Sequence, residues 1–173
     1  MKILITVLIT ILILILAGLI LMFSGAINVS VLKPQSPIVE WFLSTTSDRS
    51  IDTRARNISV PSLQSEEMIK TGTEHYLEMC QICHGAPGIS DTELAQGLEP
   101  KPPHLYDQPE TGEGNEAHNF WVIKNGIMMT AMPAWGVTHS DEKIWTIVAF
   151  VTTLPEMTAE EYHQLYEQRT PMQ

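Results

Sequence analysis

The stretch Cys80-Gln81-Ile82-Cys83-His84 brings two thiols and one imidazole together within five consecutive residues. Residues three and four apart share a face of a helical turn, so Cys80, Cys83 and His84 can all point toward one bound group. Gly85 follows at once, and it lets the chain leave without a side chain that would collide with that group. The segment therefore predicts a site at which two sulfurs and one nitrogen act together.

The C-x-x-C-H spacing is typical of covalent c-type haem attachment, in which the cysteines form thioethers to the haem vinyl groups and the histidine binds iron. Three other interpretations compete with it. A thioredoxin-like redox pair needs a βαβ context, a zinc site needs at least one more ligand, and a plain disulfide needs an oxidising compartment. We expect one covalent haem c, attached by Cys80 and Cys83, with His84 on the iron.

A haem iron bound by one histidine requires a sixth ligand or an open position. The best candidate is Met132, because Pro133 restricts it to an extended backbone that suits a loop holding a thioether. Most methionines fill gaps in cores, and this chain has nine, so Met128 and Met129 remain alternative sulfurs. An empty site or a second histidine is the other alternative. The histidines that could serve are His104, His118 and His139.

The part around this motif, residues 65–156, shows several helix signals and no convincing alternating strand. We therefore expect an all-α domain. Each expected helix follows a capping Ser or Asn, and the last two end near Gly126 and Pro155. The three helices are expected over residues 65–83, 116–125 and 141–153.

The N-terminus is dominated by 21 residues, Ile3 to Phe23, that are almost all Ile, Leu and Val. At ~1.5 Å per residue, a helix of this length crosses the ~30 Å hydrocarbon core of a bilayer. A cleaved secretory signal is the competing interpretation, but its apolar stretch is usually shorter, ~7–15 residues. We expect a single-pass anchor in lipid through residues 3–23. Lys2 would stay on the cytoplasmic side, and the remainder would lie on the periplasmic side of an inner membrane.

Between anchor and domain, the sequence indicates a connector. Pro37 to about Leu43 fits a short helix capped by Ser36, and its apolar side chains suit either the lipid interface or docking onto a partner subunit. Residues 44–60 lack a clear period and read as an extended strap. After the domain, Thr158 and Glu161 fit a capping box for a terminal helix. The expected organisation is an anchor over 1–26, a juxtamembrane connector over 27–64, a haem domain over 65–156 and a helical tail over 157–173.

Composition limits the partners. The chain has 10 Lys and Arg against 20 Asp and Glu, a net charge of −10. A surface of this sign repels phosphate backbones, so nucleic-acid binding is excluded. Two cysteines make neither a multi-disulfide scaffold nor a four-thiolate metal site. Partners that associate by long-range attraction should present basic residues.

Over residues 65–156 the order of the motifs resembles class I c-type cytochromes. The resemblance implies a cytochrome c fold around one haem, with His84 as proximal and Met132 as distal ligand. It also places Gly72 and Tyr76 where the first and last helices cross. A proline carbonyl, from Pro100, Pro102 or Pro103, should accept the other N–H of His84. The motifs that carry the resemblance are Cys80–His84, the prolines of 100–103, residues 120–127, residues 132–136 and residues 144–155.

The resemblance implies a carrier of one electron. With both axial positions filled, iron has no vacant site for substrate, so we expect an electron-transfer protein rather than an enzyme. The expected function is a membrane-tethered carrier between respiratory partners, or a subunit of a larger respiratory or dehydrogenase complex. The alternative is a haem-based ligand sensor or redox enzyme whose sixth ligand is labile or absent.

Overall fold

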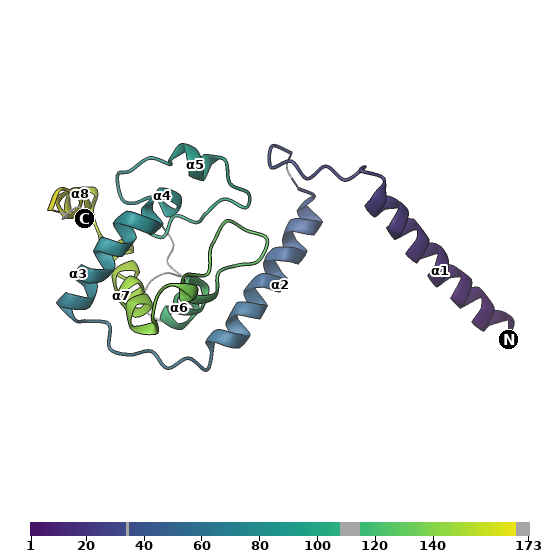
Figure 1. The fold of residues 1–173 in the computed structure, drawn as a ribbon, viewed down its shortest axis with the longest axis horizontal. Helices are drawn as coiled ribbons and strands as arrows, with labels where there is room; N and C mark the ends of the chain where they lie inside the picture. Colours follow the sequence, from purple (N-terminus) through teal and green to yellow (C-terminus); the bar gives the residue numbers. More distant parts are fainter. Residues whose placement is uncertain (34, 108–114, 169–173) are drawn as a thin grey trace. The chain divides into compact units, whose positions relative to one another are not determined.

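The structure is a computed structural model that describes residues 1–33, 35–107 and 115–168. These residues form helices joined by turns and loops (Figure 1), and the described β-pairing is limited to one isolated bridge between Ala86 and Ile89. The chain divides into two units, Met1–Gln35 and Ser36–Gln173. The all-helical class predicted from the sequence is confirmed.

The first unit contains one long apolar helix, α1 (Lys2–Phe23), of 22 residues. Within the described part of the chain, it is the one helix long and apolar enough to cross a membrane, although an N-terminal signal sequence passes the same test. Its threonine hydroxyls donate to carbonyl oxygens one turn earlier, Thr6 to Lys2 and Thr10 to Thr6. An apolar environment would therefore leave neither hydroxyl unpaired.

The second unit opens with α2 (Pro37–Ala55), which corrects the expectation of a short helix followed by a strap. The helix does begin at Pro37, but it continues three turns beyond Leu43 because its later residues find tertiary partners. Ile51 and Ala55 are buried, α2 packs on α6, and Asp52 lies 3.1 Å from Nδ1 of His118 on that helix. Burial and pairing thus supply the stability that a sequence rich in Ser and Thr does not.

The remaining elements surround one core. The expected first helix, 65–83, is present as three segments, while the helix over 116–125 has the expected bounds and that over 141–153 ends two residues early. Ser140 caps α7 by accepting from the amide of Lys143. The elements are α3 (Glu66–His75), a π-turn η1 (Tyr76–Cys80), α4 (Gln81–His84), α5 (Glu93–Gln96), α6 (Glu116–Asn125), η3 (Trp135–Val137), α7 (Asp141–Val151), η4 (Leu154–Glu156) and α8 (Ala159–Gln168).

Helices α3 and α7 pack against each other (Figure 1). Gly72 of α3 lies where the two backbones approach closely. A Cβ placed on Gly72 would lie 1.9 Å from the carbonyl oxygen of Thr146, which is backbone and cannot rotate away. Near the same crossing, the rings of Tyr76 and Phe150 lie 5.2 Å apart between centroids. The expected crossing of the first and last helices of the domain is confirmed in this geometry.

Replacing Gly72 by alanine should therefore destabilise the domain. The methyl group must push α3 and α7 apart, and we expect a loss of about 3 kcal/mol, the upper end of the usual range for overpacking. Chemical denaturation of the purified protein measures it. Gly97→Ala is the matched control, because a Cβ there meets only ordinary contacts at 3.6 and 3.7 Å. Equal stability of the two variants would contradict the close approach.

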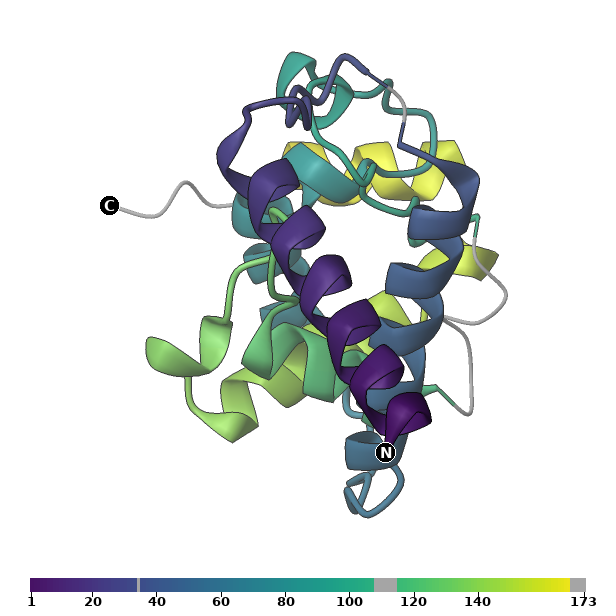
Figure 2. The same ribbon diagram turned by 90° about the vertical axis from the view of Figure 1, so that its right-hand side faces the viewer.

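The core also includes the C-terminal helix. Residues with no exposed surface include Tyr76, Ile144, Phe150 and Leu154, and Tyr162 of α8 is equally buried. The capping box predicted for this helix is present, since Glu161 accepts from the Thr158 amide and the Thr158 hydroxyl at 2.8 Å. Figure 2 shows α8, in yellow, close to the teal segment that holds Cys80 to His84. The segment after residue 156 therefore packs with the helices around the motif.

Candidate functional site

The Cys80–His84 segment lies where the first helix of the domain changes its winding. Tyr76–Cys80 form a π-turn, closed by the amide of Gln81 donating to the carbonyl of Tyr76. Such turns insert one extra residue into a helix and occur frequently at functional sites. The turn re-aims Cys83 and His84, which belong to α4, relative to α3. The sequence predicted one continuous helix here, and no feature of it signalled the insertion.

Both cysteines are free thiols and partly buried. Burial foremost, with a contribution from Cys83, raises the pKa of the Cys80 thiol to about 12. In the described part of the chain, no group of three or more His, Cys, Asp or Glu side chains could hold a metal ion. The described residues therefore do not supply the further ligands that the zinc alternative needs beside the cysteines. The βαβ context of the thioredoxin alternative is equally lacking among the described residues.

His84 is oriented by a backbone carbonyl. Its Nδ1 lies 2.9 Å from the carbonyl oxygen of Pro103, which can only accept, so Nδ1 carries the proton and donates. Nε2 is thereby left with a lone pair, the form in which a histidine binds iron. Burial lowers the pKa of this imidazole and favours its neutral state. Of the three prolines that the sequence left open, the structure selects Pro103.

Hydrogen bonds also hold the backbone directly after His84. Gly85 adopts a positive φ of 66°, and its carbonyl accepts from the buried hydroxyl of Tyr76 at 2.8 Å. On the other side of α4, the hydroxyl of Thr92 donates to the carbonyl of Ile82. Side chains on both sides of the motif in the sequence, Tyr76 before it and Thr92 after it, therefore hydrogen-bond the backbone around Cys83 and His84.

A backbone hydrogen bond between Ile127 and Met132 closes the loop that carries Met132. The carbonyl of Met132 accepts from the Ile127 amide at 3.2 Å, and its amide donates to the hydroxyl of Thr130 at 3.1 Å. Gly126 permits this closure, because a Cβ there would lie 2.8 Å from the carbonyl oxygen of Met132. The loop thus fixes the backbone of Met132 rigidly after α6.

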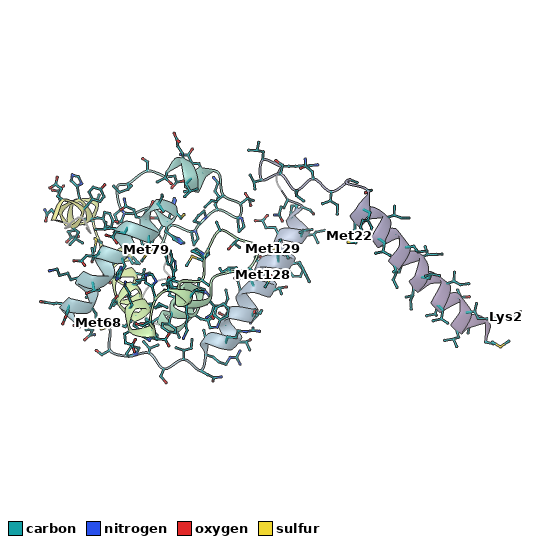
Figure 3. All side chains as sticks on the ribbon, viewed as in Figure 1. Lys2, Met22, Met68, Met79, Met128 and Met129 are labelled. Atoms are coloured by element: carbon teal, nitrogen blue, oxygen red, sulfur yellow. The ribbon has the colours of Figure 1, made fainter. Side chains whose placement is uncertain are left out.

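The three sulfurs of this loop have different environments. Met132 is partly buried and packs against the core, whereas Met128 and Met129 are 90% and 93% exposed. Figure 3 shows both of these on the loop between α6 and η3. Burial therefore favours Met132 over its two neighbours.

The three histidines that competed with Met132 have other partners. His104 Nε2 lies 2.7 Å from Asp91, and its ring stacks on Tyr106. His118 contacts Asp52 of α2, and His139 Nδ1 lies 2.8 Å from the hydroxyl of Thr138. These contacts give each imidazole a role in packing or surface pairing. The arrangement supports a thioether rather than a second imidazole as the distal ligand.

One buried side-chain donor, the amide nitrogen of Asn119, lacks a hydrogen-bond acceptor in the part of the chain that the structure describes. The amide nitrogen of Asn119, on α6 beside the core residue Phe120, is buried and has no hydrogen-bond acceptor among the described residues. A buried donor without an acceptor costs about 1–3 kcal/mol, so such groups usually face a bound molecule or water. Haem carries two propionates that could accept from it. No feature of the sequence singles out Asn119, and its unpaired buried donor is evident only in the structure.

A chain of aromatic rings supports the segment after Met132. Trp135 contacts His139 with 5.4 Å between ring centroids, and His139 meets His75 of α3 at 5.9 Å. His75 is buried, and its pKa is lowered from 6.5 mainly by that burial, then by Lys143 and His139, with Glu74 acting in the opposite direction. The neutral form of His75 is therefore part of the folded state.

This burial predicts acid sensitivity. The unfolded chain binds a proton at His75 more readily than the folded one, so the free energy of unfolding should fall as pH decreases below 6.5, toward the lowered pKa. Denaturant titrations between about pH 5 and 8 measure this slope. His75→Gln should flatten it, whereas the same change at His163, whose side chain is 60% exposed, should not. An unchanged slope in His75→Gln would contradict the assignment.

Comparison with known proteins identifies the motif region. A family model described as cytochrome c oxidase, cbb3-type, subunit III, matches residues 67–151, which span α3 to α7. No solved structure matches the chain. The matched region includes Cys80, Cys83, His84 and Met132, and it excludes both α2 and α8.

Proposed function

Residues 67–151 form a c-type cytochrome domain, a haem-binding module of electron transfer, and on this premise we propose that the chain is a membrane-tethered carrier of one electron between respiratory partners. Thioethers from Cys80 and Cys83 attach the haem, and His84 and Met132 are its axial ligands. The haem supplies a metal that alternates between ferrous and ferric states. The protein supplies attachment, ligand orientation and exclusion of water.

The hydrogen bond from His84 Nδ1 to Pro103 carries this proposal. It fixes the tautomer and the ring orientation, so that Nε2 offers its lone pair away from the carbonyl. A histidine held in this way beside two free cysteines has the donor set of a haem attachment site, and the Pro103 carbonyl orients its ring.

A thioether as distal ligand favours the carrier over the sensor. Soft sulfur stabilises ferrous iron, and burial against apolar side chains adds to this effect, so the reduction potential should be positive. Met132 sits in a loop closed by four hydrogen bonds among Ile127, Thr130 and Met132, which disfavours its release. A six-coordinate iron without a vacant position suits electron transfer rather than substrate chemistry. Any catalysis then belongs to a partner.

Charge indicates the kind of partner. From residue 57 onward the sequence has five basic and 17 acidic residues. Basic redox proteins would be attracted to such a surface, and their association should slow as salt screens the charges. We therefore propose that the redox partners present basic surfaces to this acidic domain.

Exposed apolar side chains favour a lasting association. The first turns of α2 carry Ile38, Trp41 and Phe42, which are 76%, 66% and 60% exposed. An ordinary connector would not present such residues to water. They support stable membership in a larger membrane-bound redox complex. The anchor α1 would hold the domain on the exported side of the cytoplasmic membrane.

The spectrum of the full chain, purified in detergent, tests this function. We expect a haem stain that survives denaturing electrophoresis and, in the oxidised protein, a near-infrared band from sulfur bound to ferric iron. A high-spin ferric spectrum that shifts with azide would establish the sensor instead. A colourless protein whose thiols both react with an alkylating agent would refute the haem site. Co-purification after gentle extraction identifies the partners.

A further inference from the structure

The terminal helix α8 lies outside the matched region and contains none of the proposed haem ligands. It nevertheless packs as part of the core. Tyr162 has no exposed surface, and Met157 and Leu165 pack against the same cluster. A tail with no function at the site would not need to bury a large polar side chain, because the hydroxyl must then find a partner.

The partner of Tyr162 belongs to the haem attachment motif. Its hydroxyl donates to the side-chain oxygen of Gln81 at 3.2 Å, across 81 positions of sequence. Gln81 follows Cys80 directly and begins α4, the turn that carries Cys83 and His84. The contact therefore links α8 to Gln81, the residue directly after the first cysteine of the motif.

A second buried tyrosine holds the opposite end of the same turn. The hydroxyl of Tyr76 donates to the carbonyl of Gly85 at 2.8 Å, directly after His84. Tyr76 and Tyr162 are both fully buried, and burial foremost, with Cys80 and then Tyr162, raises the pKa of Tyr76 far above its usual value. The two phenol hydroxyls thus donate to the two ends of α4, Tyr162 at its first residue and Tyr76 just after its last.

The position of α8 is fixed by two further features. A Cβ on Gly88 would lie 2.7 Å from the Cβ of Ala159, so the first turn of α8 lies against the loop that leaves the motif. The capping box of Thr158 and Glu161 fixes the start of the helix. Tyr162 lies one turn after this cap, so its hydroxyl reaches Gln81 from a helix whose start is defined by the capping box and by close packing on Gly88.

We propose that Tyr162 is a positioning residue for haem attachment, and that α8 braces the Cys80–His84 turn from outside the cytochrome domain proper. With Tyr76 it clamps α4 at both ends, so that two thiols and one imidazole keep a common orientation. The inference rests on haem attachment by this motif, which the proposed function includes. It adds that α8 must be in place to orient the Cys80–His84 segment, which the electron-transfer function alone does not imply.

The test uses Tyr162→Phe in the full-length haem protein, which keeps the ring and removes the hydroxyl. Losing one hydrogen bond that restrains the turn should accelerate amide hydrogen exchange at residues 82–85 about tenfold. Exchange in α6, which the phenol does not contact through a described hydrogen bond, should change far less. Tyr166→Phe, one turn further along α8 and only partly buried, is the matched control and should leave residues 82–85 unchanged.

Gln81→Met provides the second arm, because Gln81 is only partly buried and its loss should not unfold the protein. It should reproduce the local acceleration at residues 82–85, and the double variant should show no further effect. Unchanged exchange at 82–85, equal acceleration throughout the domain, or additive effects of the two variants would each overturn the proposal. The near-infrared band, recorded on the same samples, reports separately on the proposed axial ligation.

Discussion

Replacing Cys80 and Cys83 by alanine is expected to abolish covalent haem, and either single replacement should reduce haem-stained protein about tenfold, because binding of the group supplies part of the folding free energy. The two thiols lie on one turn, both free and both partly buried, so each supplies one of two attachments to the same group. Haem staining after denaturing electrophoresis, normalised to total protein, measures the loss.

The control for this prediction lies next to the motif. Met79 precedes Cys80 and is partly buried against the core, but the structure gives it no part in attachment. Met79→Leu conserves volume and should retain full staining. If the double alanine variant stained as strongly as the wild type, covalent attachment would be assigned to the wrong residues. If Met79→Leu lost staining equally, the cysteine result would reflect folding in general.

The attachment motif was predictable because its chemistry is local. Five consecutive residues determine which groups share a face, and no distant residue can change that spacing. The same holds for the ends of α6 and α7, where Gly126 and Ser140 act on their own neighbours. The π-turn that ends at Cys80 was not predictable, since no feature of the local sequence marks it.

The partners of the motif come from far along the chain. Pro103 accepts from His84 across 19 positions and Tyr162 donates to Gln81 across 81, so each contact depends on the fold as a whole. The sequence narrowed the first to three prolines through a family resemblance, and it offered no reason to connect a terminal helix with the haem. The extent of α2 was missed for the same reason, because its second half depends on burial against α6.

Met132→Ala is expected to keep the covalent haem while lowering its reduction potential on the order of 0.1 V, a fraction of the ~0.8 V range that axial ligands span. The variant retains both thioethers and His84 but loses the soft sulfur that stabilises ferrous iron. The near-infrared band of the oxidised protein should disappear, and azide should bind to the vacated position. Potentiometric titration of the full-length protein, followed by its visible spectrum, measures the shift.

Met128→Ala and Met129→Ala are the matched controls, because they remove a thioether from the same loop at positions that are 90% and 93% exposed. Neither should move the potential or the band. Retention of both signals in Met132→Ala, with their loss in one of the controls, would assign the sulfur to the neighbour. The decisive property is burial: three methionines lie within five residues, and the core contacts of Met132 distinguish it from the two that face solvent.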